Sequence, residues 1–279
     1  MNQIVISKYS SLLVILLSTI QMPINAENIT TKVFEKVSGS VVIIKAHSKK
    51  YGDFQGSGVL IEDGKTIVTN LHVVQNATMV NIEFPDGRIF RSKGYLAVNT
   101  DKDLITIRLP KKISGLSAVK IANLNGLKVG QKVVAIGSPQ GLSNTVSEGI
   151  ISAIRELNPS TKVIQTTAPL SPGSSGGGLF NEQGRLIGIT SFHHIDGQNL
   201  NFAYPADEII PLLKEGSLIP FYQLQRSNLY AKSSPEVFVT RSGRKYHHPN
   251  CRYLRKSKIP MTIVQASDKG YSPCNVCIR

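Results

Sequence analysis

Short apolar runs rich in β-branched residues recur along most of the chain, separated by Gly, Pro, Asn and Asp. They occupy residues 40–47, 57–63, 66–70, 79–84, 104–109, 131–137, 149–154, 162–167 and 185–192. Many short strands with turn signals at this spacing are typical of a sandwich or a barrel. Helical patterns are confined to residues 30–37, with Thr30 or Thr31 as cap, and to residues 206–214, which Pro211 shortens. The sequence therefore predicts an all-β fold.

The first 26 residues have the layout of a secretory signal peptide. Lys8 is their only charged residue, an apolar run covers residues 12–20, and Ala26 offers a small residue for cleavage. The apolar run is too short to span a bilayer comfortably. We predict cleavage after Ala26 and a periplasmic or secreted mature protein without a membrane span. An uncleaved membrane anchor is the alternative.

The C-terminal part of the chain differs in composition from the rest. Residues 226–279 carry 11 Lys or Arg against two acidic residues, and they hold the only three cysteines. Residues 221–235 are polar and lack the strand pattern, which is typical of a linker. We predict a large domain at residues 27–220, a linker at residues 221–235 and a small module at residues 236–279.

A glycine-rich turn at residues 172–179, PGSSGGGL, contains the candidate nucleophile Ser175. Glycine permits backbone angles that other residues avoid, so a hydroxyl can project into a cleft while backbone N–H groups converge on an oxyanion. We assign the oxyanion hole to Gly173, Ser174 and Ser175, with the N–H groups of Gly173 and Ser175 as the donors. The alternative is a flexible Gly/Ser loop.

A serine hydroxyl needs a base, and the base needs an orienting carboxylate. His72 follows the predicted strand 66–70, although a lone histidine in an apolar stretch is often only a packed residue. Asp103 opens the apolar run 104–109, and Asp101 is its rival. We predict a catalytic triad of His72, Asp103 and Ser175, in the order found in chymotrypsin.

Four blocks of the sequence together resemble the HtrA/Deg family of trypsin-like serine proteases. They are GSGVLIEDGKTIVTNLHVV (56–74), DLITIRL (103–109), AIGSPQGLSNTVSEGIISAI (135–154) and IQTTAPLSPGSSGGGLFNEQGRLIGI (164–189), and the resemblance extends over about residues 30–215. It implies a chymotrypsin-like double β-barrel of six strands each, with endopeptidase activity, often on misfolded envelope proteins. The chain departs from the family at Ser174, where Asn is usual, and in the extra glycine of Gly176-Gly177-Gly178. No PDZ domain is expected after the protease domain.

The resemblance also bears on specificity. In trypsin-like enzymes an acid about six residues before the nucleophile selects basic substrates, and here that position is Pro169. We therefore expect a pocket for a small or medium apolar residue. We predict that it is lined by Pro169, Leu170, Thr190, Ser191, Phe192 and Ala203.

Two pairs of soft ligands in the C-terminal module suit tetrahedral zinc. The predicted ligands are His247, Cys251, Cys274 and Cys277, with His248 as an alternative to His247. A module of this size needs such a staple, so zinc would be structural and the module α+β. It resembles the metal-binding domain of the Ada DNA-repair protein, but His247 stands where that domain has its methyl-accepting cysteine. A Cys274–Cys277 disulfide is the competing interpretation.

The sequence thus predicts a serine endopeptidase that needs no catalytic cofactor and acts on proteins or peptides. Two alternatives remain: a peptide-binding pseudoprotease, and a surface- or nucleic-acid-binding protein that works through the basic module. An acidic surface or polymer is a partner consistent with that module. An oligomer is compatible with the sequence.

Overall fold

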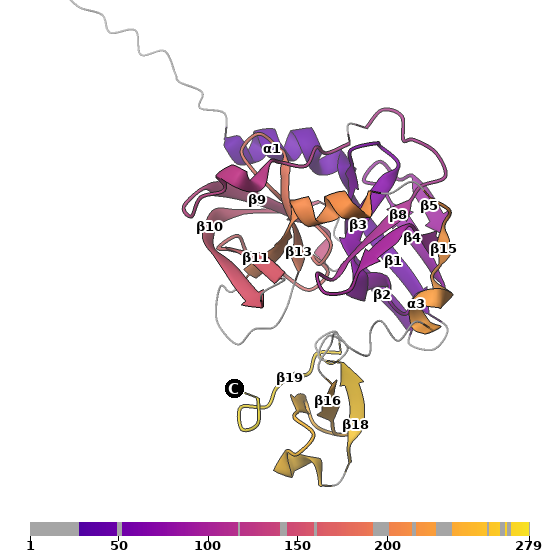
Figure 1. Cartoon of the computed structure of the whole chain (residues 1–279), viewed down its shortest axis with the longest axis vertical. Coiled ribbons are helices and arrows are strands. Elements are labelled where there is room, and N and C mark those ends of the chain that lie inside the picture. The colour runs from indigo at the N-terminus through magenta and orange to yellow at the C-terminus, as the bar shows by residue number, and fades with distance from the viewer. Residues whose placement is uncertain are drawn as a thin grey trace, which may run out of the picture.

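The structure, a computed structural model, describes residues 28–48, 52–116, 118–139, 144–158, 161–191, 201–213, 216–226, 236–255, 257–262, 266 and 269–278. The predicted signal peptide at residues 1–26 lies outside these residues. Most of the described strands gather into two neighbouring β units (Figure 1).

The first unit is an antiparallel sheet of seven strands in the order β5-β4-β1-β2-β3-β8-β7. Its strands are β1 (Val41–Ser48), β2 (Gly52–Ile61), β3 (Thr66–Asn70), β4 (Met79–Glu83), β5 (Ile89–Ser92), β7 (Ala97–Asn99) and β8 (Leu104–Arg108). Fully buried aliphatic side chains such as Ile44, Leu60 and Ile105 fill its core. A short strand, β6 (Gly94–Tyr95), pairs with β15 (Ile219–Pro220), so the chain returns to this unit after completing the second.

The second unit is a closed barrel in the order β10-β11-β14-β13-β12-β9. Its strands are β9 (Lys132–Gly137), β10 (Thr145–Asn158), β11 (Thr161–Thr166), β12 (Gly178–Phe180), β13 (Leu186–Ser191) and β14 (Asn201–Pro205). One hydrophobic cluster contains side chains of both units, including Val68 and Leu104 of the first and Ile136 and Phe180 of the second. This shared core fixes the position of one unit against the other.

The predicted all-β fold class is confirmed, with one difference in detail. Six strands close the second barrel as expected, whereas the sheet of the first unit contains seven strands. Each predicted strand run overlaps an observed strand, although the ends differ, and strands such as β5, β7, β12 and β14 had not been predicted.

The helices are short and lie between or beside the strands. They are α1 (Ile29–Val37), α2 (Leu71–Val74), α3 (Tyr222–Arg226), and the 3₁₀ helices η1 (Ser38–Ser40), η2 (Leu124–Gly126), η4 (Ala206–Leu212) and η5 (Arg252–Leu254). The cap of α1 is Asn28, whose Oδ1 accepts the Thr30 N–H at 2.9 Å, so the cap predicted at Thr30 or Thr31 is wrong. Among the described residues, no helix combines the length and apolar character needed to cross a membrane.

The predicted linker begins too early at residue 221. Phe221 is fully buried in the core of the first unit, where its ring lies 6.1 Å from that of Tyr95, and Leu224 of α3 is buried in the same cluster. Phe221 stands at the start of a mostly polar stretch that gave no periodic signal, and its burial depends on tertiary contacts. Residues 227–235 lie outside the described part of the chain.

The described C-terminal residues form a sheet of their own in the order β18-β16-β17-β19. Its strands are β16 (Glu236–Val239), β17 (Lys245–His247), β18 (Ile259–Thr262) and β19 (Ser272–Pro273). Its core is thin: Val237, Val239, Tyr246 and Ala266 form one cluster, and a second consists largely of cysteines. Such a small core favours an additional staple.

Candidate active site

The register between β3 and β8 brings His72 beside Asp103. Asn70 at the end of β3 pairs with Leu104 at the start of β8, and the ladder continues with the Leu71 N–H donating to the Asp103 carbonyl at 2.9 Å. The chain then enters α2, which carries His72. In an antiparallel pair, the residue after one strand therefore faces the residue before the other.

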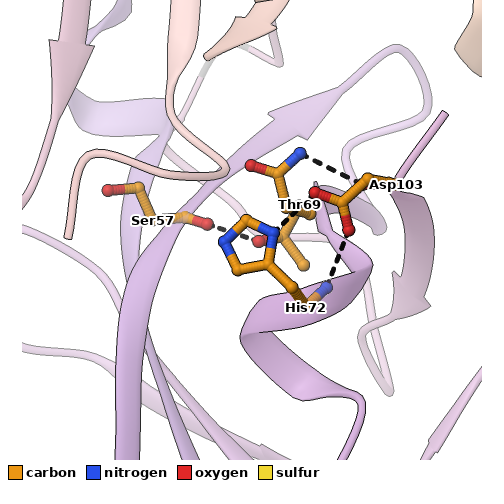
Figure 2. A network of polar contacts seen from close by, with 5 residues as sticks. Ser57, Thr69, His72 and Asp103 are labelled. Carbon is orange, nitrogen blue, oxygen red and sulfur yellow. Dashed lines mark hydrogen bonds and ion pairs between the residues drawn. The ribbon is translucent and has the colours of Figure 1, made fainter. Parts of the chain in front are cut away.

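Asp103 contacts His72 twice, as Figure 2 shows. Its Oδ2 lies 2.5 Å from the imidazole Nδ1, and its Oδ1 accepts the backbone N–H of His72 at 2.9 Å. The Asp103 carbonyl also accepts the Asn70 side-chain amide at 3.0 Å. Asp103 has a φ of 49°, a left-handed conformation that Asp tolerates better than most residues. Because these contacts engage the ring at Nδ1, a proton transferred by this imidazole would have to use Nε2.

Ser175 lies in a tight loop between Leu170 and β12. The Gly176 N–H donates to the Thr190 carbonyl at 2.8 Å, and the Thr190 hydroxyl donates to the Ser174 carbonyl at 2.7 Å. The Ser175 carbonyl accepts the Ser57 N–H of β2 at 2.7 Å. The loop is therefore held by strands from both β units.

Gly56 of β2 shows that the nucleophile loop and the histidine helix meet. A Cβ placed on Gly56 would lie 2.7 Å from the methyl carbons of Val73 and 3.0 Å from the Ser175 carbonyl oxygen. Val73 directly follows His72, so α2 and the Ser175 main chain both lie within reach of this one strand residue. His72, Asp103 and Ser175 are all between 6 and 9% exposed. The Ser175 main chain thus lies close to the helix that carries His72, at the junction of the two β units.

Residues 56–189 match the trypsin-like peptidase domain family. These residues are similar to trypsin-like peptidases, and we refer to this part of the chain as the peptidase domain.

The peptidase domain is similar to proteases of the HtrA/DegP type. The chain is 40% identical over 183 residues to the periplasmic serine endoprotease DegP of Escherichia coli K12, covering 62% of this chain and 38% of that protein. It is 35% identical over 211 residues to the mitochondrial serine protease HTRA2 of Drosophila pseudoobscura, covering 69% and 48%. The crystal structure of the serine endoprotease from Yersinia pestis superposes with a TM-score of 0.58 at 26% identity, covering 78% of this chain and 73% of that one. The chain spans less than half the length of these two curated relatives.

The nucleophile loop of the peptidase domain contains all three residues that we assigned to the oxyanion hole. The Ser174 N–H donates to the Ser171 carbonyl at 2.9 Å and is thus used inside the loop, which is compatible with Gly173 and Ser175 as the two donors. Gly173 has a φ of 94°, which a residue with a Cβ rarely adopts. The N–H groups of Gly173 and Ser175 remain the predicted donors.

The predicted pocket residues differ in their burial and in their contacts. Thr190 and Ala203 pair across β13 and β14 and are both buried, and Thr190 contacts the nucleophile loop. Ser191 is buried with a hydroxyl that has no partner among the described residues. Leu170 is half-buried against the core of the second barrel, whereas Pro169 is exposed. Phe192 lies outside the described residues, so the pocket and its specificity stay predictions.

Ser57 and Thr69 near the site had not been identified from the sequence, and Thr190 had been predicted only as a pocket residue. Each of the three donates its side-chain hydroxyl to a main-chain carbonyl in this region. The only local signal was at Ser57, a polar residue between two glycines inside a predicted strand.

The C-terminal module gathers one histidine and three cysteines. One ligand atom from each of His247, Cys251, Cys274 and Cys277 lies within 4.8 Å of all the others, and all three cysteines are free thiols. His247 Nδ1 lies 3.3 Å from Cys251 Sγ, while His248 is exposed and contributes only its backbone N–H to Cys277 Sγ. Three thiols and one imidazole in such a compact cluster fit a structural zinc ion.

Charge and burial shift the pKa values of two side chains in this cluster. Burial, with Lys245 nearby, lowers the pKa of His247, which keeps the imidazole neutral and able to bind a metal. Burial raises the pKa of Cys277 to about 11, so without a metal this thiol holds its proton at neutral pH. A metal ion would have to displace that proton.

Proposed function

We propose that the chain is a serine endopeptidase whose triad is His72, Asp103 and Ser175. The observation that supports it most is the double contact of the Asp103 carboxylate with the ring and main chain of His72. A pseudoprotease that only binds peptides needs neither an aligned base and carboxylate nor a nucleophile loop held by hydrogen bonds.

In the proposed mechanism, the Ser175 hydroxyl attacks the carbonyl carbon of the scissile peptide bond and its proton passes to Nε2 of His72. The negative charge on the carbonyl oxygen is stabilised by the N–H groups of Gly173 and Ser175. His72 then protonates the leaving amine, the C–N bond breaks, and an acyl ester remains on Ser175. A water molecule, deprotonated by His72, hydrolyses that ester and restores the serine. Asp103 stabilises the imidazolium in both steps.

Several broader features belong to the same proposal. The relatives named DegP are described as periplasmic endoproteases, and residues 1–26 have the pattern of a signal peptide. We therefore place the mature enzyme in the periplasm or outside the cell, acting on misfolded or envelope proteins. The absence of a PDZ domain and the assembly into an oligomer stay open predictions.

The decisive experiment compares the mature protein with Ser175→Ala on an unfolded, casein-like substrate. The wild type should cleave it and be inactivated by a serine-directed acylating reagent. Ser175→Ala should lose about 10⁴-fold or more in kcat, because the nucleophile cannot be replaced by another triad member. His72→Ala should behave similarly. Full activity in Ser175→Ala would overturn the assignment.

For the C-terminal module we propose a structural zinc ion bound by His247, Cys251, Cys274 and Cys277, in an Ada-like fold. The ion would hold β17, η5 and the residues after β19 together, and it has no role in peptide hydrolysis.

A second candidate function for this module is binding of an acidic surface or polymer. Arg241, Arg244, Arg252 and Arg255 are exposed, and a hollow of about 550 Å³ lies beside Arg244, Lys245 and Tyr253. Binding through such charges weakens as salt rises. Retention of the full-length Ser175→Ala protein on an anionic resin, compared with Arg241→Gln/Arg244→Gln, tests this proposal; salt-independent retention by both would exclude it.

A further inference from the structure

Ser57 lies at the centre of the contacts that hold the active site together. It is fully buried on β2, where it pairs with Ile43 of β1 and is flanked by Gly56 and Gly58. Its main-chain and side-chain groups reach three segments that are far apart in sequence: the nucleophile loop, the end of β3 and the residue after β9.

The hydroxyl of Ser57 uses both its proton and an acceptor site. The N–H of Ser138 donates to Oγ at 2.8 Å, and Oγ lies 2.8 Å from the Gly173 carbonyl. An amide N–H can only donate and a carbonyl can only accept, so the single hydroxyl proton must point at Gly173. The direction of this hydrogen bond is therefore set by its two neighbours.

The main chain of Ser57 anchors two further points. Its N–H donates to the Ser175 carbonyl at 2.7 Å, and its carbonyl accepts the Thr69 hydroxyl at 2.6 Å (Figure 2). Thr69 stands three residues before His72, on the strand that leads into α2. One residue thus fixes the carbonyls on both sides of Ser174 and contacts the strand that positions the base.

The Ser174 carbonyl, which lies between those of Gly173 and Ser175 in the sequence, is held by Thr190 of β13. Thr190 donates its hydroxyl to the Ser174 carbonyl, and in a trans peptide the N–H points away from the C=O. The N–H of Ser175 therefore turns away from Thr190. Ser57 binds the Gly173 carbonyl, which shares a peptide plane with the Ser174 N–H. The Gly173 N–H belongs to the preceding peptide, and the φ of 94° at Gly173 relates the two planes, so holding the second plane restrains Gly173 from one side.

We propose that the Ser57 hydroxyl is a positioning group for catalysis: by binding the Gly173 carbonyl, it sets the orientation of Gly173 in the oxyanion hole. The inference rests on the proposed triad. It does not make Ser57 a catalytic residue, because Ser57 acts only through the nucleophile loop. Donors held in place before the reaction stabilise an oxyanion without reorganising, so losing the anchor should raise the barrier rather than weaken substrate binding.

The test compares Ser57→Ala with the wild type on a fluorogenic peptide and on a boronic acid of the same sequence. The boronic acid forms a tetrahedral adduct with Ser175 and places an oxygen in the hole. We expect kcat to fall about 10- to 100-fold and the boronic acid affinity to fall in parallel. KM should change by no more than a factor of about two, because the lost interaction acts in the transition state. The pH dependence of kcat/KM should keep its midpoint, because the His72–Asp103 pair is intact.

The matched control is Ser92→Ala. Ser92 is also buried, and its hydroxyl donates to a backbone carbonyl, that of Gly94, at 2.8 Å. It should lower thermal stability without changing kcat or boronic acid affinity. If Ser57→Ala does not fold, Ser57→Cys, which is slightly larger and a weaker donor, replaces it and should show the same parallel loss.

The outcomes separate this inference from the proposed function. Wild-type kcat and boronic acid affinity in folded Ser57→Ala would overturn the role of Ser57, with Ser175→Ala still inactive. An active Ser175→Ala would instead overturn the triad itself. An equal effect of Ser92→Ala on boronic acid affinity would also reject the inference, since general loosening of the fold would then explain the result.

Discussion

Asp103 contacts His72 at two points: its Oδ2 lies 2.5 Å from the ring Nδ1, and its Oδ1 accepts the backbone N–H at 2.9 Å. A carboxylate that holds both the ring and the main chain sets the angle of the imidazole relative to α2. It also sets the tautomer, because Nδ1 must carry the proton when it faces an ionised carboxylate.

Asp103→Asn should separate this electrostatic role from the backbone role. Asn accepts the left-handed φ of 49° nearly as well as Asp, so stability should change little. Its side-chain amide, however, would favour the wrong tautomer of His72, and kcat should fall about 10⁴-fold. Steady-state kinetics and a thermal melt measure the two effects.

Asp103→Ala is the companion variant. Alanine should lose both activity and about 1–2 kcal/mol of stability, since a Cβ without a polar group is disfavoured at positive φ. Near-wild-type kcat in Asp103→Asn would show that His72 does not depend on Asp103.

Gly176 and Gly87 form a matched pair, each with a φ of 86°. A Cβ on Gly87 would meet nothing within 4 Å, whereas one on Gly176 would lie 2.1 Å from the Ser57 carbonyl oxygen and 2.3 Å from Thr69 Oγ1. Gly87→Ala should therefore lower the free energy of unfolding by about 1 kcal/mol, and Gly176→Ala by about 3 kcal/mol or more.

Urea unfolding in the Ser175→Ala background, which prevents self-cleavage, measures both values. In the otherwise wild-type protein, Gly176→Ala should also abolish activity while Gly87→Ala keeps it. Equal losses of stability would mean that the loop moves aside to admit a methyl group.

Removal of metal should unfold the C-terminal module and leave the peptidase domain folded. The module has a thin core and gathers four metal-binding side chains, whereas residues 27–220 contain no cysteine. Metal analysis of the full chain should find one zinc ion, and a strong chelator should remove only the module's unfolding transition. Protein without metal that carries a Cys274–Cys277 disulfide by mass spectrometry would contradict the zinc site.

Acid should release the metal. The zinc ligands are thiolates, and burial raises the pKa of the Cys277 thiol to about 11, so protons compete with the ion increasingly as the pH falls. The lowered pKa of His247 means that its own proton competes only at a lower pH. The apparent zinc affinity should thus drop steeply between about pH 8 and pH 6, as competition with a chromophoric chelator would show.

His247→Gln and His248→Gln are the controls for this titration. His247 belongs to the cluster, so its replacement should weaken zinc binding, whereas the exposed side chain of His248 should be replaceable without effect. A larger loss in His248→Gln would reverse the assignment of the fourth ligand.

The sequence alone was sufficient for features that depend on neighbouring residues. Runs such as 104–109 and 131–137 identify their strands because β-branched residues pack well on a pleated surface. Gly173 and Gly176 mark a loop with positive φ, and the spacing of His247, Cys251, Cys274 and Cys277 predicts a ligand set that the structure brings together. Local chemistry was also sufficient to select His72 and Asp103 as partners.

Tertiary structure decided everything that joins distant segments. The β3–β8 register, not the spacing of 31 residues, puts Asp103 against His72, and closure of the second barrel against the first sheet carries Gly173 to Ser57 across 116 residues. The same contacts explain why Phe221 is buried within a polar stretch and why Gly176 must be glycine, since Ser57 and Thr69 occupy the space of its Cβ. Hydrogen bonds and close packing between remote strands depend on how the sheets close, and no local propensity encodes that closure.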